Sequence, residues 1–284
     1  MSDEPRALSI PIPGGRIEAL LLPGGPGLPL LVLGGVEIGL RLLAGSENAH
    51  IRRWERRTAH RPVVVMGRPL PDDPADAARM LHPRAAAGSV ARGLKALRAV
   101  VPPLAVEAES GGGRISLWLT VDHPELVARL VLSSVASETP PDSPMTERMA
   151  QWLDLAERGE WADFFAQLAA QLKPAGSVAG HAAPGSSKFQ PTPSTPERFI
   201  GELRATLDPT SFVTDRLGDI KVPTLVLAGG RDQVVPLAAT RLVAERIPGS
   251  RFEVDPECGH TVRASFRGYD DLVEAFLAEG DPQP

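Results

Sequence analysis

Short apolar runs alternate with helix-length amphipathic stretches along most of the chain. The runs are rich in leucine and β-branched residues and are bounded by glycine, proline or charged positions. Such runs are typical of strands that are buried on both faces of a parallel sheet. We expect strands at Leu30–Leu33, Val63–Met66, Leu104–Ala108, Leu130–Leu132, Thr224–Leu227 and Arg251–Val254.

Helical patterns occupy the intervals between these runs. Their regular alternation with the strands predicts a mainly parallel, doubly wound α/β sheet. Near the start of the chain, Ala7–Ile12 and Arg16–Leu22 flank a Pro-Gly-Gly turn, which predicts an antiparallel hairpin at a sheet edge. The expected helices are Val90–Val100, the stretch from Gly111 to Ala128, Leu237–Ile247 and Tyr269–Ala278.

The composition changes between residues 138 and 218. Met145–Leu172 carries tryptophan and phenylalanine side chains at helical spacing, which predicts one or two apolar helical faces. Residues 174–196 are rich in proline, glycine, serine and alanine, as is typical of a loop. Each aromatic side chain alone is expected to pack a helix onto the core, but together they indicate an apolar roof over a site. We therefore expect a core of residues 1–137 and 219–284, with residues 138–218 as a helical cap.

Composition and charge limit the classes of function. The chain has 284 residues, 43% of them hydrophobic, which suits one large α/β domain with an insertion or two small domains. Its net charge is -5 and its pI is about 5.7, so nothing indicates a broad electrostatic attraction to nucleic acid or anionic membranes. The single cysteine, Cys258, excludes an intrachain disulfide and any metal site built from several cysteines.

No segment has the pattern of a membrane span or a signal peptide. The longest uncharged stretch, Ala19–Val36, contains three prolines and five glycines, so strand, turn and strand explain it better. The N-terminal residues Met-Ser-Asp-Glu-Pro-Arg lack the apolar segment of a signal peptide. We therefore expect a cytoplasmic protein.

The third of the long apolar runs ends in Ala-Glu-Ser-Gly-Gly, in which Ser110 is followed by three glycines. A strand that turns at once into a helix forces the corner residue into a strained backbone, which small neighbours tolerate. The serine hydroxyl then projects free of the sheet. Ala108 stands where glycine is usual, and we expect its methyl group to be accommodated because Gly111 and Gly112 still let the helix approach. Taken alone, the motif is also compatible with a flexible loop.

A serine hydroxyl becomes an effective nucleophile when a histidine takes its proton and a carboxylate orients that histidine. Of the six histidines, His260 follows the last predicted strand in a glycine-containing loop, and Asp232 follows the strand at Thr224–Leu227. Catalytic groups in open α/β sheets gather at the carboxyl ends of strands. Ser110, Asp232 and His260 therefore form the expected triad. Taken singly, a turn-capping aspartate and an ordinary loop histidine are the alternatives.

These features resemble the α/β-hydrolase family, in its esterase and lactonase-like branch with a cap. The resemblance covers about Leu30 to Leu277 and is most specific in Ala-Glu-Ser-Gly-Gly, Leu-Ala-Gly-Gly-Arg-Asp-Gln-Val-Val-Pro and Asp-Pro-Glu-Cys-Gly-His. It implies an eight-stranded, mostly parallel sheet with a helical cap inserted after the sixth strand. It also implies Ser110 as the nucleophile, Asp232 as the orienting acid and His260 as the general base.

The same resemblance implies an oxyanion hole made of two backbone N–H groups. One belongs to Gly111, directly after the nucleophile. The other normally follows a His-Gly pair at the end of the third strand, where this chain has Leu-Gly-Gly-Val. Val36 is therefore the expected second donor, with Gly35 as the alternative. Gly34 replaces a histidine whose side chain usually supports this loop.

Two other segments depart from family patterns. After the fourth strand, Met66-Gly67-Arg68-Pro69 replaces the usual Asp-x-x-Gly turn, and we expect an altered loop there. Residues 23–27, Pro-Gly-Gly-Pro-Gly, resemble a loop of proline iminopeptidases, but they precede their strand and lack its histidine. A turn between two strands explains this segment better than a peptidase site does.

The expected reaction is acyl transfer to water, in which Ser110 attacks an ester or lactone carbonyl and water hydrolyses the acyl-enzyme. Serine at the elbow disfavours dehalogenase and epoxide-hydrolase chemistry, which uses an aspartate nucleophile. A thioesterase, a carbon-carbon bond hydrolase and a noncatalytic ligand-binding protein stay open as alternatives. No cofactor or metal is needed. The expected partner is a small to medium apolar, ester-like molecule, with a homodimer left open.

Overall fold

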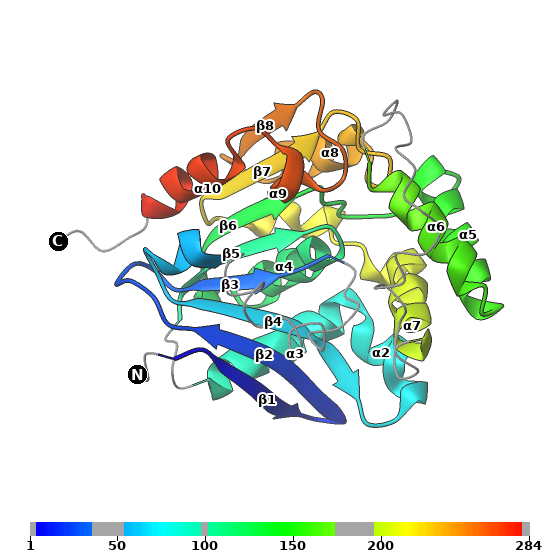
Figure 1. Ribbon diagram of the computed structural model, residues 1–284, viewed down its shortest axis with the longest axis horizontal. Coiled ribbons are helices and arrows are strands. Elements are labelled where there is room, and N and C mark those ends of the chain that lie inside the picture. Colours follow the sequence, from blue (N-terminus) through cyan, green and yellow to red (C-terminus); the bar gives the residue numbers. More distant parts are fainter. Residues whose placement is uncertain (1–3, 36–53, 98–101, 174–195, 280–284) are drawn as a thin grey trace.

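An eight-stranded sheet forms the centre of the protein (Figure 1). The computed structural model describes residues 4–35, 54–97, 102–173 and 196–279. Every strand expected from the sequence is present. The strands are β1 (Arg6–Ile12), β2 (Gly15–Leu22), β3 (Leu30–Leu33), β4 (Val63–Pro71), β5 (Leu104–Glu109), β6 (Val127–Ser133), β7 (Thr224–Gly229) and β8 (Arg251–Asp255).

The strand order is β1-β2-β4-β3-β5-β6-β7-β8. The predicted hairpin of β1 and β2 is antiparallel, and β2 also pairs antiparallel with β4. All other neighbouring strands are parallel, so the sheet is mostly parallel as expected. From β3 the chain passes to β4 on one side and later to β5 on the other. Such a reversal of strand order opens a crevice at the carboxyl ends of the strands, where ligands bind in open α/β sheets.

Strand β4 is longer than the sequence indicated. The prediction of a loop at Met66-Gly67-Arg68-Pro69 is wrong. The strand continues to Pro71, which pairs with Gly15 of β2. The proline and glycine signals favoured a turn. They were overridden because the eight-residue β2 extends beyond Met66 and offers an antiparallel partner to the segment.

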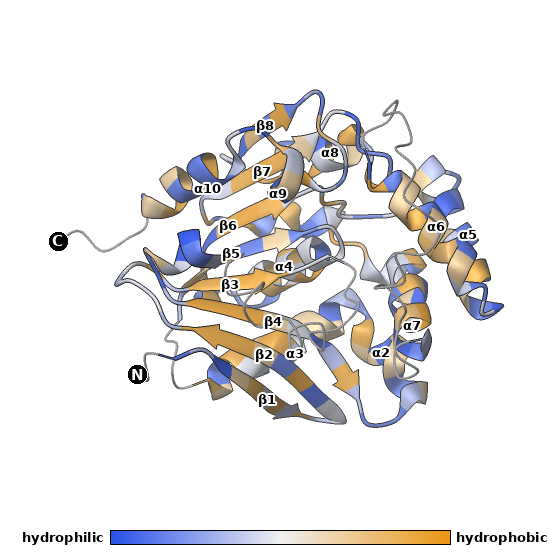
Figure 2. Ribbon diagram, in the orientation of Figure 1, coloured by the Kyte–Doolittle hydropathy of each residue, from blue (hydrophilic) through white to orange (hydrophobic). Residues whose placement is uncertain are grey.

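Helices cover both faces of the sheet, and the strands between them are strongly hydrophobic (Figure 2). One face packs against α3 (Pro83–Ala96), α4 (Gly111–Asp122) and α8 (Leu237–Arg246), and the other against α9 (Val262–Ser265) and α10 (Tyr269–Ala278). The short elements are α2 (Ala77–Leu81), η2 (Pro74–Asp76), η3 (Pro124–Leu126), η4 (Pro209–Ser211) and η5 (Thr214–Asp219).

The largest differences from the expected helix boundaries are at the start of α3 and the end of α4. Helix α3 begins at Pro83 rather than at Val90, because proline fits the first turn of a helix, where its missing N–H is not needed. The helix after the elbow ends at Asp122, and the expected helical residues from Val127 onward belong to β6. His123 and Pro124 separate the two elements, and a residue that precedes proline disfavours the helical conformation.

Among the described residues between β6 and β7, three α-helices are inserted and lie beyond one end of the sheet (Figure 1). They are α5 (Pro144–Glu157), α6 (Trp161–Gln171) and α7 (Pro196–Leu207), and we call them the inserted helices. Edge-to-face aromatic contacts join all three, with ring centroids 5.9 Å apart for Trp152 and Phe164 and 5.0 Å for Phe164 and Phe199. Residues 174–195, which make up most of the predicted loop, lie outside the described residues.

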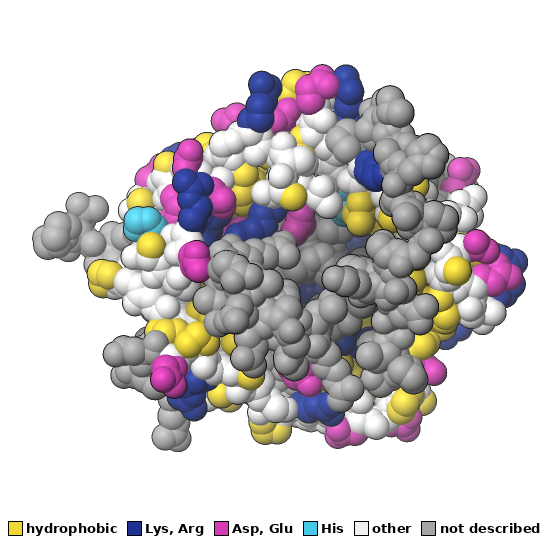
Figure 3. All heavy atoms as spheres, in the orientation of Figure 1, with side chains coloured by type: hydrophobic (Ala, Val, Ile, Leu, Met, Phe, Trp, Pro, Cys, Tyr) yellow, Lys and Arg dark blue, Asp and Glu magenta, His cyan; other side chains and the backbone are white. Residues whose placement is uncertain are grey.

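Acidic and basic side chains are interspersed around the face shown in Figure 3. None of the helices in the described part of the chain is both long and apolar enough to cross a membrane.

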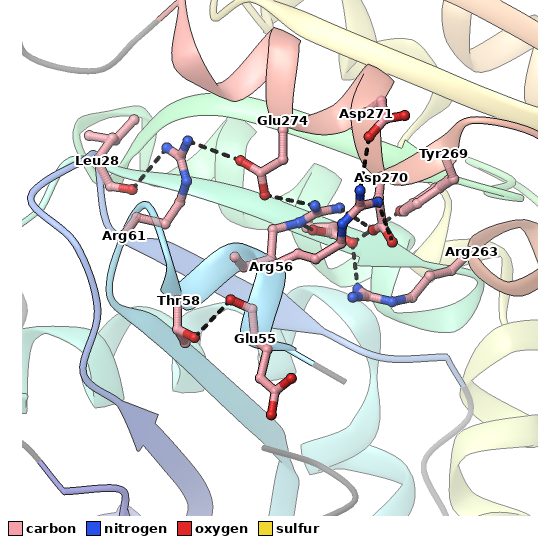
Figure 4. A network of polar contacts seen from close by, with 12 residues as sticks. Leu28, Glu55, Arg56, Thr58, Arg61, Arg263, Tyr269, Asp270, Asp271 and Glu274 are labelled. Atoms are coloured by element: carbon pink, nitrogen blue, oxygen red, sulfur yellow. Dashed lines mark hydrogen bonds and ion pairs between the residues drawn. The ribbon is translucent and has the colours of Figure 1, made fainter. Parts of the chain in front are cut away.

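A buried carboxylate crosslinks the sheet to the segments packed on one face. Glu107 of β5 is 3% exposed and accepts hydrogen bonds from Arg57 Nε at 3.0 Å, Arg263 Nη1 at 2.7 Å and the Tyr269 hydroxyl at 3.1 Å. Arg57 also pairs with Glu274 of α10 at 2.7 Å, within the wider network of Figure 4. Burial alone would raise the pKa of Glu107, but the guanidinium groups of Arg263 and Arg57 hold that pKa below its usual value.

We expect Glu107→Ala to lower the free energy of unfolding by about 3–5 kcal/mol at pH 7, because it leaves buried guanidinium charge uncompensated. The folded-state pKa of Glu107 is depressed, so its contribution is present above its usual pKa of 4.5 and is lost as the pH falls below that value. The mutational difference should therefore shrink in acid. Urea unfolding at several pH values measures it.

Glu279→Ala is the control, because Glu279 is exposed and pairs with the exposed Arg251. This variant should unfold almost as the wild type does. Equal stability of Glu107→Ala and Glu279→Ala at pH 7 would contradict the role of the buried network.

Candidate active site

Ser110 stands at a sharp corner between β5 and α4. Its backbone has φ 51° and ψ -124°, a left-handed φ that costs a residue with a side chain about 1–3 kcal/mol. The corner is fixed on both sides, since Ser110 N donates to Ser133 O at 3.0 Å and Gly113 N donates to Ser110 O at 2.9 Å. The strand, tight turn and helix expected around the serine are therefore present, and the side chain stands at the carboxyl end of β5.

Two glycines allow the first turn of α4 to approach the sheet. A Cβ atom at Gly112 would collide with the carbonyl oxygens of Leu33 and Gly34. A Cβ atom at Gly113 would collide with the side chain of Val135. Ala108 is accommodated at 1% exposure, so the tight positions of this elbow are those after the serine rather than the one before it.

The structure brings the three predicted triad residues together. His260 Nε2 lies 3.0 Å from Ser110 Oγ, and His260 Nδ1 lies 2.9 Å from Asp232 Oδ2. The side chains of His260 and Asp232 are 8% and 1% exposed. A histidine held in this way presents one ring nitrogen to the serine and the other to a carboxylate, which is the arrangement that activates a serine hydroxyl.

The loop after β7 holds Asp232 in place. Its Oδ1 accepts hydrogen bonds from the backbone N–H groups of Val234 at 2.8 Å and Val235 at 2.9 Å. The carboxylate therefore caps its own turn and binds the histidine at the same time. Turn capping and orientation of a histidine, which are alternatives from the sequence alone, are both present in the structure.

Backbone groups approach Ser110 from two sides. Gly111 is the first residue of α4, where N–H groups have no partner within the helix. Gly35 follows β3, and a Cβ atom built on it would lie 3.4 Å from Ser110 Cβ and 3.9 Å from Oγ. Gly35 therefore lies beside the hydroxyl. Val36, the expected second donor, lies outside the described residues.

The sequence analysis did not assign a role to Arg68, which the structure places next to this region. Arg68 Nη2 donates to the carbonyl oxygens of Gly34 at 3.0 Å and Gly35 at 2.7 Å. The available signal was an arginine two residues after the apolar run at Val63–Met66. Since that segment was expected to be a loop, nothing indicated that the side chain would be buried.

A cavity of about 240 Å³ opens at Ser110 and His260. Its wall is mainly apolar and comes from the inserted helices and from the loops at the sheet edge. The inserted helices contribute Met145, Met149, Trp152, Leu168 and Leu203, and Leu172 directly follows α6. Of the residues that the structure describes, no three histidine, cysteine, aspartate or glutamate side chains converge to hold a metal ion.

Arg114 of α4 ties the inserted helices to the core. It donates to Ala136 O at 3.2 Å and Thr139 Oγ1 at 2.9 Å before the first inserted helix, and to Thr206 O at 2.9 Å in α7 and Ser211 Oγ at 3.2 Å after it. Burial lowers the pKa of Arg114 to about 10, with Glu138 acting in the opposite direction, so the guanidinium stays charged at neutral pH. One buried side chain thus connects both ends of the insertion beneath the cavity.

Comparison with known proteins identifies the family. The family model for serine aminopeptidases of type S33 (Hydrolase_4) matches residues 92–263. Because the match spans more than half of the chain and includes all three triad positions, the chain belongs to this family of α/β hydrolases.

Two curated relatives differ in their named activities. The 2-hydroxymuconate semialdehyde hydrolase of Pseudomonas putida is 30% identical over 185 residues, which cover 62% of this chain and 63% of that protein. A proline iminopeptidase of Lactobacillus acidophilus is 26% identical over 182 residues, covering 54% of this chain and 57% of that protein. The match thus spans less than two thirds of the length of either relative.

Solved structures share the fold at low sequence identity. A thermophilic esterase from Thermogutta terrifontis superposes with a TM-score of 0.73 and 20% identity, over 98% of this chain and 100% of that one. At 20% sequence identity, this structural similarity establishes the fold alone. The expected α/β-hydrolase fold is thereby confirmed.

We expect Gly112→Ala to destabilise the protein by about 1–3 kcal/mol, because the added methyl group forces α4 away from the end of β3. Urea unfolding followed by circular dichroism measures the change. Gly218→Ala is the control, since a Cβ atom there meets nothing within 4 Å in the described structure. If both variants unfolded like the wild type, the close approach at Gly112 would not be required.

Proposed function

We propose that the protein is a serine hydrolase that cleaves the carboxylic ester or lactone of a small to medium apolar substrate through an acyl-enzyme intermediate. The observation that carries this proposal is the continuous contact from Ser110 Oγ to His260 Nε2 at 3.0 Å and from His260 Nδ1 to Asp232 Oδ2 at 2.9 Å. This geometry occurs at the edge of the sheet where ligands bind, beside an apolar cavity.

In the proposed mechanism, Ser110 Oγ attacks the substrate carbonyl carbon while His260 Nε2 takes its proton. Asp232 stabilises the positive charge that develops on the imidazole. His260 then gives the proton to the leaving oxygen, and the acyl group stays on Ser110. A water molecule, deprotonated by His260, attacks the acyl-enzyme, releases the carboxylic acid and returns the proton to Ser110.

The negative charge on the carbonyl oxygen needs two N–H donors in each tetrahedral intermediate. We assign one donor to Gly111, whose N–H is at the first position of α4. The second is Val36 or Gly35. Gly111 follows Ser110 in the chain, and Gly35 lies beside Ser110 in space, which supports the assignment.

We assign residues 138–218 to a cap that determines which substrates reach the triad. Support comes from the cavity wall, where side chains of the inserted helices face Ser110 across an apolar space. Val234 and Val235 next to Asp232 pack in the same cluster as the inserted helices. An apolar acyl or alcohol group would bury its surface there, at about 25 cal/mol for each Å² removed from water.

A carbon-carbon bond hydrolase is the second candidate, favoured by the relative named 2-hydroxymuconate semialdehyde hydrolase. The same triad is compatible with such a reaction, since fold and triad do not fix the leaving group. A peptidase gains less support from this chain. Gly25 N and Gly27 N of the iminopeptidase-like segment donate to Thr58 O and His60 O, so the segment is a structural turn before β3.

We expect a fluorophosphonate probe to label the wild type at Ser110 and to leave Ser110→Ala unlabelled, because the probe reacts with an activated serine. The site of labelling is read by mass spectrometry. His260→Ala should label at least 100-fold more slowly, since no base takes the proton. A folded wild type that resists the probe would refute the proposed catalytic serine.

A hydrolysis screen distinguishes the two candidate reactions. We expect turnover of short and medium p-nitrophenyl esters and of lactones, with kcat/KM rising from the acetyl to the butyryl or hexanoyl ester as more of the apolar wall is covered. Product formation is followed by absorbance or by pH. Fast cleavage of a vinylogous 1,5-diketone together with slow ester cleavage would favour the carbon-carbon bond hydrolase instead.

A further inference from the structure

Arg68 is a buried cation whose contacts lead to the oxyanion side of the site. It is 2% exposed and belongs to the part of β4 that extends past the predicted strand. One nitrogen, Nη2, donates to both Gly34 O and Gly35 O. A third contact runs from Arg68 Nε to Glu202 Oε1 of α7 at 3.1 Å. Arg68 thus connects β4, the residues after β3 and the inserted helices.

The two carbonyl groups bound by Arg68 are those that orient both candidate oxyanion donors. A carbonyl shares a rigid planar peptide unit with the N–H group of the next residue. Gly34 O and Gly35 O therefore belong to the peptide units that carry the N–H groups of Gly35 and Val36. A donor that fixes these carbonyl groups limits the directions that the two N–H groups can take, whichever of them binds the oxyanion.

The Arg68 contacts hold a backbone segment that has no side chain at position 34. The resemblance to α/β hydrolases implies a supporting histidine where this chain has Gly34, and a Cβ atom built on Gly34 meets no described atom within 4 Å. Packing at position 34 therefore does not hold the backbone. Consecutive glycines lose the most conformational entropy when they are ordered, so the segment needs an external restraint. The charge-assisted contacts of Arg68 supply one, and bonds of this kind are stronger than those between neutral groups.

Glu202 holds the guanidinium from the side of the inserted helices. Its side chain is 9% exposed, and its second oxygen, Oε2, has no hydrogen-bond partner among the described residues. Removing a carboxylate from water is costly unless it is paired, so the contact with Arg68 is strongly favoured once α7 is packed. Glu202 also lines the cavity. The position of Arg68 therefore depends on the inserted helices as well as on β4.

We propose that Arg68 is a positioning residue that keeps the backbone at Gly34 and Gly35 in the orientation needed by the oxyanion hole, and that Glu202 of α7 keeps Arg68 in place. This inference rests on the proposed serine hydrolase function. In this proposal, an arginine from the neighbouring strand β4 supports the segment after β3, where the resemblance implies a histidine. It also makes oxyanion stabilisation depend on the packing of the inserted helices.

The test compares Arg68→Lys and Arg68→Ala with the wild type on one p-nitrophenyl ester. The oxyanion hole acts on the transition state, and loss of one donor lowers kcat by about 100- to 1000-fold. We expect kcat to fall about 100-fold in Arg68→Ala, less in Arg68→Lys, while KM changes by less than about 3-fold. Addition of millimolar methylguanidinium should restore part of kcat in Arg68→Ala, whereas methylammonium should restore less.

Two further variants isolate the role of the contact. Glu202→Gln keeps the shape of the side chain but removes its charge, and we expect kcat to fall about 10-fold at unchanged KM. Arg84→Ala is the matched arginine control, because Arg84 binds Asp122 between α3 and α4 through two hydrogen bonds while remaining exposed. Its kcat and KM should equal those of the wild type.

The outcomes separate this inference from the proposed function. A wild type without esterase activity or serine labelling refutes both. A wild type that turns over the ester, with Arg68→Lys and Glu202→Gln at full kcat, refutes the inference alone. All rates are normalised to the concentration of active sites, measured by burst titration. A loss of activity that disappears on normalisation is a folding defect, and this outcome also refutes the inference about Arg68. If Arg68→Ala does not fold, Arg68→Lys and Glu202→Gln decide the question.

Discussion

The strained backbone at Ser110 is the constraint on which the site depends. A left-handed φ at a serine persists only when its surroundings leave no alternative. Here β6 holds the amide through Ser133 O, while the first turn of α4 holds the carbonyl. Gly112 then lets that turn rest on the carbonyl groups of Leu33 and Gly34. The corner that presents the hydroxyl therefore also fixes how closely the end of β3 approaches it.

The buried network around Glu107 extends this control to the histidine. Glu107 precedes Ser110 by three residues on β5, and Arg263 follows His260 by three residues. Their side chains meet at 2.7 Å, so an ion pair joins the strand that carries the serine to the segment that carries the histidine. Buried ion pairs contribute little net stability compared with apolar packing, but they are costly to break. The network thus favours one relative placement of β5 and α9.

Local sequence patterns predicted most of the fold and the three reactive side chains. The central strands were recognisable because burial on both faces requires continuous apolar runs, and Ser110 and Asp232 follow two such runs, β5 and β7. His260 follows the alternating edge strand β8, whose side chains are partly exposed. The expectation failed where a long-range partner overrode a local signal. Gly67 and Pro69 indicate a turn by themselves, yet the strand continues through a register shift at Gly67 and Arg68, and Pro69 pairs with Ile17 of β2. No local pattern shows where β2 ends in space, so the extension of β4 could not be predicted.

The proposed role of Arg68 depends on that unpredicted extension. If the backbone had turned after Met66, the Arg68 side chain would have started from a different place, and its contacts with Gly34 O and Gly35 O would not follow. The extended strand instead carries Arg68 past the end of β3, where Glu202 completes its ion pair. Under the proposed role of Arg68, the two departures from the pattern that the resemblance implies, at Gly34 and at Met66–Pro69, are coupled. A chain that regained the histidine would need Arg68 less, and a chain that lost Arg68 would need the histidine more.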